Sequence, residues 1–175
     1  DPEFYQLLAK GGASSMYTVF GFDRASRELF SKDCSKDTWQ KNIDLVRMNE
    51  DAGIHFFATY GIGFDDQDKG VFDRILQFSF DANIDLAEFF IHTPFPGTPF
   101  GELCKKENRI IHRNYSYWNT GNVVFKPAQM TEHELLEGFK YCWKEFYKNK
   151  EPQKTIRSFT VEENCGTAEL HQITA

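Results

Sequence analysis

The sequence lacks the features that mark several protein classes. No window of its 175 residues approaches the run of about 18 apolar residues that a membrane-spanning helix needs, and no secretory signal opens it. Basic residues are outnumbered, with 20 Lys and Arg against 26 Asp and Glu and a formal net charge of −6. This balance argues against non-specific nucleic-acid binding and against a basic membrane-surface patch. We therefore expect neither nucleic acid nor a membrane as a partner.

The cysteines and histidines form no recognisable metal-binding or nucleophilic motif. None of Cys34, Cys104, Cys142 and Cys165 has a second cysteine within the two to four residues that a metal hairpin needs. The five histidines show no i,i+4 pairing, and no GxSxG elbow is present. Scattered thiols without a secretion signal indicate reduced, structural cysteines and a cytoplasmic protein. We assign no catalytic residue and no metal site, and we expect no iron–sulfur cluster on the isolated chain.

The composition is typical of a globular domain with an aromatic core. Hydrophobic residues make up 41% of the chain, charged residues 26%, and Phe alone occurs 18 times. Three apolar runs rich in β-formers predict buried strands over residues 16–22, 54–64 and 86–92. Helices are predicted over residues 1–10, from Thr38 to the residue before Gly53, and over 71–82, with a polar loop over 23–37. Strands that alternate with helices imply right-handed βαβ units and a parallel sheet.

The alternation ends after the third predicted strand. The Pro-rich turn at residues 93–100 precedes a short helix within 101–111 and an irregular stretch with one extended piece at 122–126. Thr131 and Glu134 have the spacing of a capping box, which predicts a further helix from residue 132 to 148. We divide the chain into a βα part at 1–100, a helical extension at 101–150 and a polar tail at 151–175, whose last residues favour a helix before Ala175.

The exits of the three predicted strands combine small and polar residues, and strand exits are where parallel α/β sheets bind ligands. Their sequences are FGFD at 20–23, GIGFD at 61–65 and TPFPGTPF at 93–100. In this order and spacing, and with the segment 108–147 that follows, they resemble the later half of radical S-adenosylmethionine enzymes. The match is closest to the subgroup with an N-terminal cobalamin-binding domain. The resemblance covers about residues 1–147, and the TPFPGTP turn with its downstream pattern is its most specific part.

The resemblance implies a fold, a function and a set of cofactors. In that family six βα units form a partial TIM-like barrel. A CxxxCxxC motif holds a [4Fe–4S] cluster, strand ends hold S-adenosylmethionine, and the subgroup adds cobalamin. This chain is similar to strands four to six plus the C-terminal extension. The expected fold is α/β, a half barrel of about three parallel βα units followed by a mostly helical extension. The expected function is that of a fragment, inactive alone, of an enzyme for radical methylation or rearrangement.

The resemblance also implies roles for eight residues in binding S-adenosylmethionine. They are Asp23, Ser26, Gly61, Ile62, Gly63, His92, Thr93 and Pro94. The two at the first exit would hydrogen-bond the ribose hydroxyls. At the second exit the two glycines would let the backbone approach the adenine, with the isoleucine packing on it. The three at the third exit would face the adenine and the substrate.

Two positions depart from the pattern of the family. The usual Glu-Ser after the fourth strand is Asp23-Arg24, and the acidic residue expected after the fifth strand falls on Gln67. The neighbouring carboxylates within 65–68 lack the spacing of a calcium loop and indicate a solvated turn. Because the cluster cysteines that anchor the amino and carboxylate groups of the cofactor are absent as well, we expect S-adenosylmethionine to bind this chain weakly or not at all.

Two other functions stay open. The second is a non-catalytic binding or assembly module that keeps the half-barrel fold; the third, which the sequence favours less, is an unrelated barrel hydrolase that uses His92 and Asp23. A half barrel leaves two strand edges unpaired. We therefore expect a homodimer through these edges, or the N-terminal half as partner. The alternative is that residues 114–129 and the helix at 132–148 fold over the open face.

Overall fold

The chain contains three strands and six α-helices within the residues that the structure describes. The structure is a computed structural model, and it describes residues 1–21, 23–148 and 150. In chain order the elements are α1 (Pro2–Lys10), β1 (Ser15–Phe20), α2 (Arg24–Leu29), α3 (Lys36–Asp51), β2 (His55–Ile62), α4 (Val71–Asp81), β3 (Leu86–Ile91), α5 (Pro99–Lys106), a 3₁₀ turn (Tyr115–Tyr117) and α6 (Glu132–Tyr147). No helix in this part of the chain combines the length and apolarity that crossing a bilayer requires.

The three strands form one open parallel sheet in the order β1-β2-β3. The α/β class and the parallel arrangement predicted from the sequence are confirmed. All three strands end earlier than predicted, at Phe20, Ile62 and Ile91. For the first two, the backbone changes direction at the glycine that follows. Gly21 and Gly63 have φ angles of +109° and +93°, which side chains with a Cβ rarely adopt.

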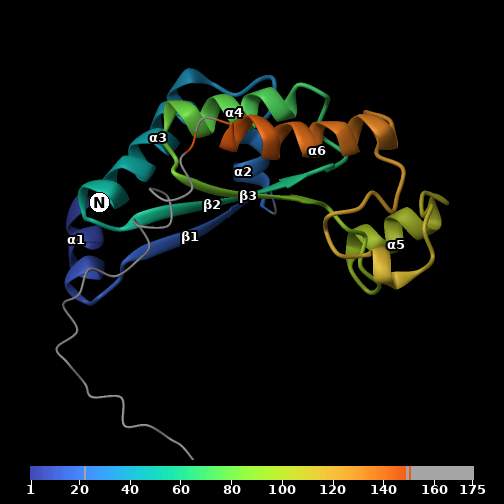
Figure 1. Cartoon of the computed structure of the whole chain (residues 1–175), viewed down its shortest axis with the longest axis horizontal. Helices are drawn as coiled ribbons and strands as arrows, with labels where there is room; N and C mark the ends of the chain where they lie inside the picture. Colours follow the sequence, from blue (N-terminus) through green and yellow to red (C-terminus); the bar gives the residue numbers. More distant parts are fainter. Residues whose placement is uncertain (22, 149, 151–175) are drawn as a thin grey trace, which may run out of the picture.

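Helices α3, α4 and α6 cover one face of the sheet (Figure 1). The centre of this core is a row of three aromatic rings, one from each strand: Phe20, Tyr60 and Phe89 stack at centroid distances of 5.4 and 5.5 Å. The Tyr60 hydroxyl, fully buried, is hydrogen-bonded to Ser79 of α4 at 2.7 Å. The apolar faces of the helices therefore close over the middle of the sheet.

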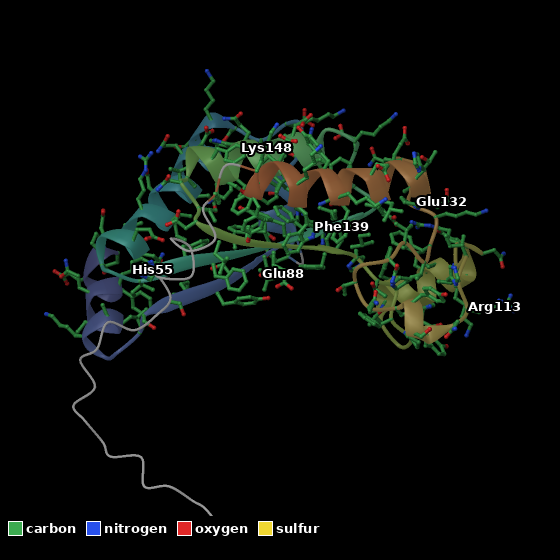
Figure 2. The ribbon with its side chains drawn as sticks, in the orientation of Figure 1. His55, Glu88, Arg113, Glu132, Phe139 and Lys148 are labelled. Atoms are coloured by element: carbon green, nitrogen blue, oxygen red, sulfur yellow. The ribbon has the colours of Figure 1, made fainter. Side chains whose placement is uncertain are left out.

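The other face of the sheet is not covered by any described helix (Figure 1). Side chains alternate along β3, with Ala87, Phe89 and Ile91 buried and the residues between them only half-buried. Figure 2 shows Glu88 on the side of the sheet away from the helices. Tyr17 of β1 lies on the same side and is 55% exposed. Parallel sheets are normally covered on both faces, whereas β3 is fully buried only on the side that faces the helices.

The extension supplies hydrogen-bond partners for some of the backbone groups at the outer edge of β3. The backbone N–H of Ala87 donates to the Tyr147 hydroxyl at 3.1 Å, and that hydroxyl donates to the Ala87 carbonyl at 2.5 Å. Farther along, the Ile91 N–H donates to the Thr120 carbonyl at 2.6 Å. These contacts make the edge of β3 a poorer template for strand addition than an unpaired strand.

Several sequence-based expectations need correction. Residues 23–37, expected as a loop, contain α2, which is capped by Asp23. Helix α3 begins at Lys36 with Ser35 as its N-cap, so the expected start at Thr38 was wrong by two positions. The capping box of Thr131 and Glu134 is confirmed. Helix α6, however, packs with α4 on the covered face, so the alternative arrangement, in which it folds over the open face, is not found. The tail at 151–175, with the helix expected before Ala175, lies outside the described residues.

Candidate functional site

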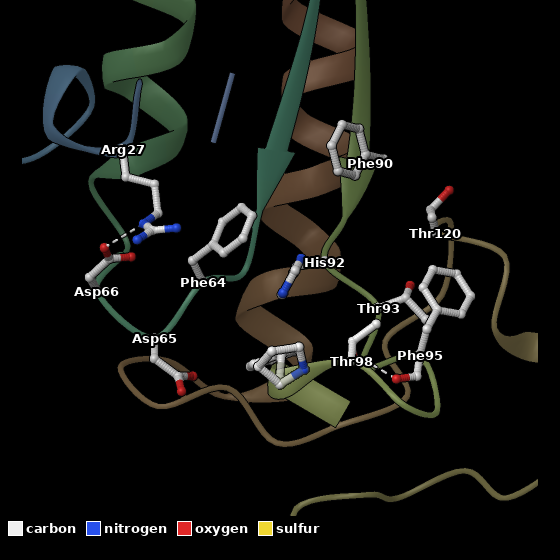
Figure 3. A pocket seen from close by; sticks show the side chains of 12 residues that line it. Arg27, Phe64, Asp65, Asp66, Phe90, His92, Thr93, Phe95, Thr98 and Thr120 are labelled. Atoms are coloured by element: carbon white, nitrogen blue, oxygen red, sulfur yellow. Dashed lines mark hydrogen bonds and ion pairs between the residues drawn. The ribbon is translucent and has the colours of Figure 1, made fainter. Parts of the chain in front are cut away.

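A cavity of about 590 Å³ lies where β2 and β3 end (Figure 3). Its walls come from the loop after β2, the turn after β3, the start of α5 and one residue of α2. The lining residues are Arg27, Phe64, Asp65, Asp66, Phe90, His92, Thr93, Phe95, Thr98, Pro99, Phe100 and Thr120. This is the position at which parallel α/β sheets bind ligands.

The imidazole of His92 is held between two aromatic rings. Its centroid lies 4.0 Å from that of Phe64 and 4.2 Å from that of Phe100. Burial lowers the pKa of His92 to about 4, because the charged form loses its hydration; Asp65 opposes the shift and Arg27 adds to it. The ring is therefore neutral at physiological pH.

Gln67 fixes the shape of the loop that enters the cavity. Its side-chain oxygen accepts from the N–H groups of Gly63 and Phe64 at 2.7 and 3.1 Å, and its amide nitrogen donates to the Gly61 carbonyl at 3.3 Å. The residue is 4% exposed. The amide thus uses both its acceptor and its donor to hold Phe64 where its ring meets His92.

The carboxylates at the rim of the cavity are paired with arginines. Asp66 accepts from Arg27 at 2.9 Å, and Asp65 accepts from both terminal nitrogens of Arg109 at 2.8 and 2.5 Å. The hydrogen bonds to Asp65, ahead of the contact with Glu107, raise the pKa of Arg109, although burial opposes them. The Asp66 and Asp65 side chains are 57% and 35% exposed, so the turn is in contact with solvent, and both carboxylates also hold other segments of the chain in place.

The eight predicted binding residues do not all reach this cavity. His92 and Thr93 line it, whereas Pro94 lines a separate cavity on the other side of the turn. Gly61 lies on the open side of the sheet, where an added Cβ would meet the rings of Phe64 and Phe90.

The remaining two residues of the second exit face the protein. The side chain of Ile62 is completely buried and belongs to the helix-covered core. An added Cβ at Gly63 would meet Leu135 of α6, so this glycine serves close helix packing. Neither residue is among those that line the cavity.

Asp23 and Ser26 bond to each other rather than facing the cavity. The Asp23 carboxylate accepts from the Ser26 N–H at 2.9 Å and from its hydroxyl at 2.7 Å, which caps α2. These bonds, the backbone one first, lower the pKa of Asp23. The Ser26 hydroxyl in turn accepts from the Gly21 N–H at 2.8 Å. Their predicted contact with a ribose would require these bonds to be exchanged.

The sequence reasoning missed the aromatic lining and Arg27. Phe64, Phe95 and Phe100 each belong to the exit motifs themselves, so their position beside the strand ends was the available signal. Arg27 carried no such signal, because it comes from the unpredicted helix α2. Its guanidinium lies 5.5 Å from the centroid of Phe64.

The described residues hold no group of three or more His, Cys, Asp or Glu side chains that fits a metal ion. Cys104 and Cys142 are buried, and burial raises the pKa of their thiols to about 11 and 12. The cavity itself offers flat apolar walls, a neutral imidazole and three threonine hydroxyls. It is suited to a planar ring with a few polar groups rather than to a metal.

Comparison with known proteins finds several relatives, among them two methyltransferases and a cyclase. No protein-family model matches the chain. It is 27% identical over 142 residues to an uncharacterised methyltransferase of Pyrococcus horikoshii; the aligned part is 81% of this chain and 30% of the relative. It is 26% identical over 153 residues (86% and 24%) to the anaerobic magnesium-protoporphyrin IX monomethyl ester cyclase of Cereibacter sphaeroides. It is 27% identical over 159 residues (89% and 34%) to the bacteriochlorophyllide d C-12(1)-methyltransferase of Chlorobaculum tepidum. The chain thus spans about a quarter to a third of the length of these curated relatives.

Proposed function

We propose that this chain forms strands four to six and the C-terminal extension of a radical S-adenosylmethionine enzyme of the cobalamin-binding subgroup. The whole enzyme would carry out a methylation or a related radical reaction, as the names of two methyltransferases and a cyclase among its relatives suggest. The observation that carries the proposal is the aromatic cavity at the ends of β2 and β3. In this assignment residues 1–100 are the βα part and 101–150 the extension.

The residues of the cavity fit one part of S-adenosylmethionine. Its adenine matches the flat walls of Phe64, Phe95 and Phe100 beside the neutral imidazole of His92. When bound, the cofactor would supply the methyl group or the radical. The role of the chain is to bind and orient the adenine and to exclude water from it.

The other two cofactors of the family, the [4Fe–4S] cluster and cobalamin, have no matching site among the described residues. A [4Fe–4S] cluster needs converging thiolates, and the described cysteines, Cys34, Cys104 and Cys142, lie on a loop, on α5 and on α6. We assign the cluster and cobalamin to the part of the enzyme that this chain does not include. The open face of the sheet is where that N-terminal part would lie.

The test is a titration of the chain with S-adenosylmethionine and 5′-deoxyadenosine, followed by amide NMR. We expect the amides of His92, Thr93 and Thr120 to shift together, with a roughly millimolar dissociation constant because the cluster anchor is missing. Phe100→Leu removes a wall and should weaken binding. Phe80→Leu is the matched control, since Phe80 is an exposed phenylalanine of α4 outside the cavity.

The proposal fails if neither compound shifts these amides at millimolar concentration, or if Phe80→Leu weakens binding as much as Phe100→Leu. Micromolar affinity would contradict the assignment of the anchor to another part of the enzyme.

A non-catalytic binding or assembly module is the second candidate. The observation in its favour is that Asp23 and Ser26 are engaged in the cap of α2. Such a module would keep the cavity without the ribose contacts, and it would cover its open face with a second copy. The titration separates the two candidates: a module without the ribose contacts should bind adenine as tightly as 5′-deoxyadenosine, whereas the enzyme part should bind 5′-deoxyadenosine more tightly.

A further inference from the structure

A second cavity of about 570 Å³ lies between the turn after β3 and the extension. Pro94 and Pro96 line it, whereas Thr93 and Phe95 line the first cavity. The turn therefore separates two cavities, with alternate residues facing each. No part of the proposed function uses the second one.

The floor of this cavity is aromatic and held in place. The rings of Tyr115 and Trp118 meet edge to face at 5.1 Å. The Trp118 indole N–H donates to the His112 carbonyl at 3.0 Å, and the Asn114 side chain caps the 3₁₀ turn that carries Tyr115. The tyrosine is nonetheless 67% exposed, so its ring is presented to solvent rather than to the core.

Two cationic side chains and one carboxylate line the same cavity. Lys105 and Glu102 lie on α5, and Arg113 lies in the irregular segment between α5 and the 3₁₀ turn. Figure 2 shows Arg113 at the α5 end of the molecule. The ion pairs found among residues 1–21, 23–148 and 150 include neither Lys105 nor Arg113. Cations elsewhere at the strand exits, Arg27 and Arg109, are neutralised by aspartates.

We propose that the second cavity binds a planar aromatic ligand that carries a carboxylate or a phosphate. The exposed ring of Tyr115, with Trp118 packed against it, supplies a stacking surface. The charges of Lys105 and Arg113, which no ion pair within the described part of the chain neutralises, attract the anionic group. Glu102 accepts a hydrogen bond from a ring amino or N–H group. This site is independent of the first cavity and of the function proposed for it.

The experiment is isothermal titration of the whole chain with two anionic aromatic compounds and their neutral analogues. Indole-3-acetate represents the carboxylates, and adenosine 5′-monophosphate represents the phosphates; indole and adenosine are the neutral analogues. We expect at least one anion to bind roughly tenfold more tightly than its analogue, the effect of one charge-assisted contact. Which anion binds more tightly identifies the source of the charge.

Substitutions then locate the binding site. Arg113→Gln and Lys105→Gln should each weaken anion binding roughly tenfold. Lys106→Gln is the matched control, because Lys106 is the next residue of α5 and does not line the cavity. Phe100→Leu should also leave this binding unchanged, since Phe100 lines only the first cavity. Circular dichroism shows whether each variant is folded.

The proposal is overturned if neither anion binds more tightly than its neutral analogue. It is also overturned if Lys106→Gln acts as strongly as Lys105→Gln, which would indicate non-specific charge attraction. Loss of binding in Phe100→Leu but not in Arg113→Gln would place the ligand in the first cavity and refute the second site.

Discussion

The substitution Gln67→Glu tests whether the amide of Gln67 holds the loop at the end of β2. The two side chains have nearly the same shape, so the exchange changes hydrogen bonding and charge but not packing. Gln67 donates to the Gly61 carbonyl at 3.3 Å and accepts from two N–H groups, all at a position that is 4% exposed. An ionised carboxylate keeps the acceptor bonds but sets a second oxygen against the Gly61 carbonyl.

The expected cost follows from these contacts. Losing the donor bond and burying a carboxylate should lower the free energy of unfolding by about 2–3 kcal/mol at neutral pH. The protonated carboxyl donates to the Gly61 carbonyl as the amide does, so below its ordinary pKa the cost should fall under about 1 kcal/mol.

The pH dependence has a definite sign. The folded protein favours the protonated carboxyl, so folding raises the pKa of the introduced group above its unfolded value of about 4.3. The stability that this group contributes is therefore complete below about pH 4.3 and is lost as the pH rises through the folded pKa. The difference from the native chain should grow by up to about 1.4 kcal/mol per pH unit in that window and then level off.

Urea denaturation at several pH values, followed by tryptophan fluorescence, measures this difference. Gln6→Glu is the control, because Gln6 is exposed on α1, and it should change the stability by less than about 0.5 kcal/mol. A variant at Gln67 that loses the same free energy at every pH, or none, would refute the argument that the amide acts through its donor.

Three further perturbations test the core, the cavity and the sheet edge. Gly138→Ala should cost about 1–3 kcal/mol in urea denaturation, because the added Cβ would lie 2.2 Å from the ring of Phe72; a gain in stability would contradict this packing. With a pKa of about 4, His92 should show no NMR titration near pH 6.5, and because the unfolded chain takes up that proton first, stability should fall as the pH drops from about 6.5 to 4. Tyr147→Phe should cost about 1–3 kcal/mol and increase self-association in light scattering, since it uncovers the backbone of Ala87; an unchanged monomer of equal stability would refute the edge role.

The strands were predictable because short runs of apolar, β-forming residues are stable only when they are buried, as in the strands of a parallel sheet. Helix α2 was not, because its six residues bury only Leu29 and give no apolar period. The one local signal was Asp23 followed three residues later by Ser26, a pattern that suits a helix N-cap. It was interpreted instead through the resemblance, as a ribose contact.

The site was predictable in position but not in composition. The rule that ligands bind at strand ends points to the place where the cavity lies, and two of the predicted residues, His92 and Thr93, line it. It could not show that Ile62 points into the core, because that depends on which residue of the strand faces the helices. The side of the sheet on which α6 packs could not be predicted either, because the apolar stripe of a helix does not indicate which face of the sheet the helix covers.

The open face and the first cavity are connected through β3. Glu88 and Phe90 lie on one side of this strand, and Phe90 lines the cavity together with His92, which follows the strand. Beside Glu88 in register is Thr59, whose buried hydroxyl has no hydrogen-bond partner among the described residues. This hydroxyl is buried by the chain itself, so a partner on the open face would not reach it. Glu88 and Phe90 are only half-buried, and a partner that lies across the face would cover them and extend the wall of the cavity, whereas one that only pairs with the edge of β1 would not.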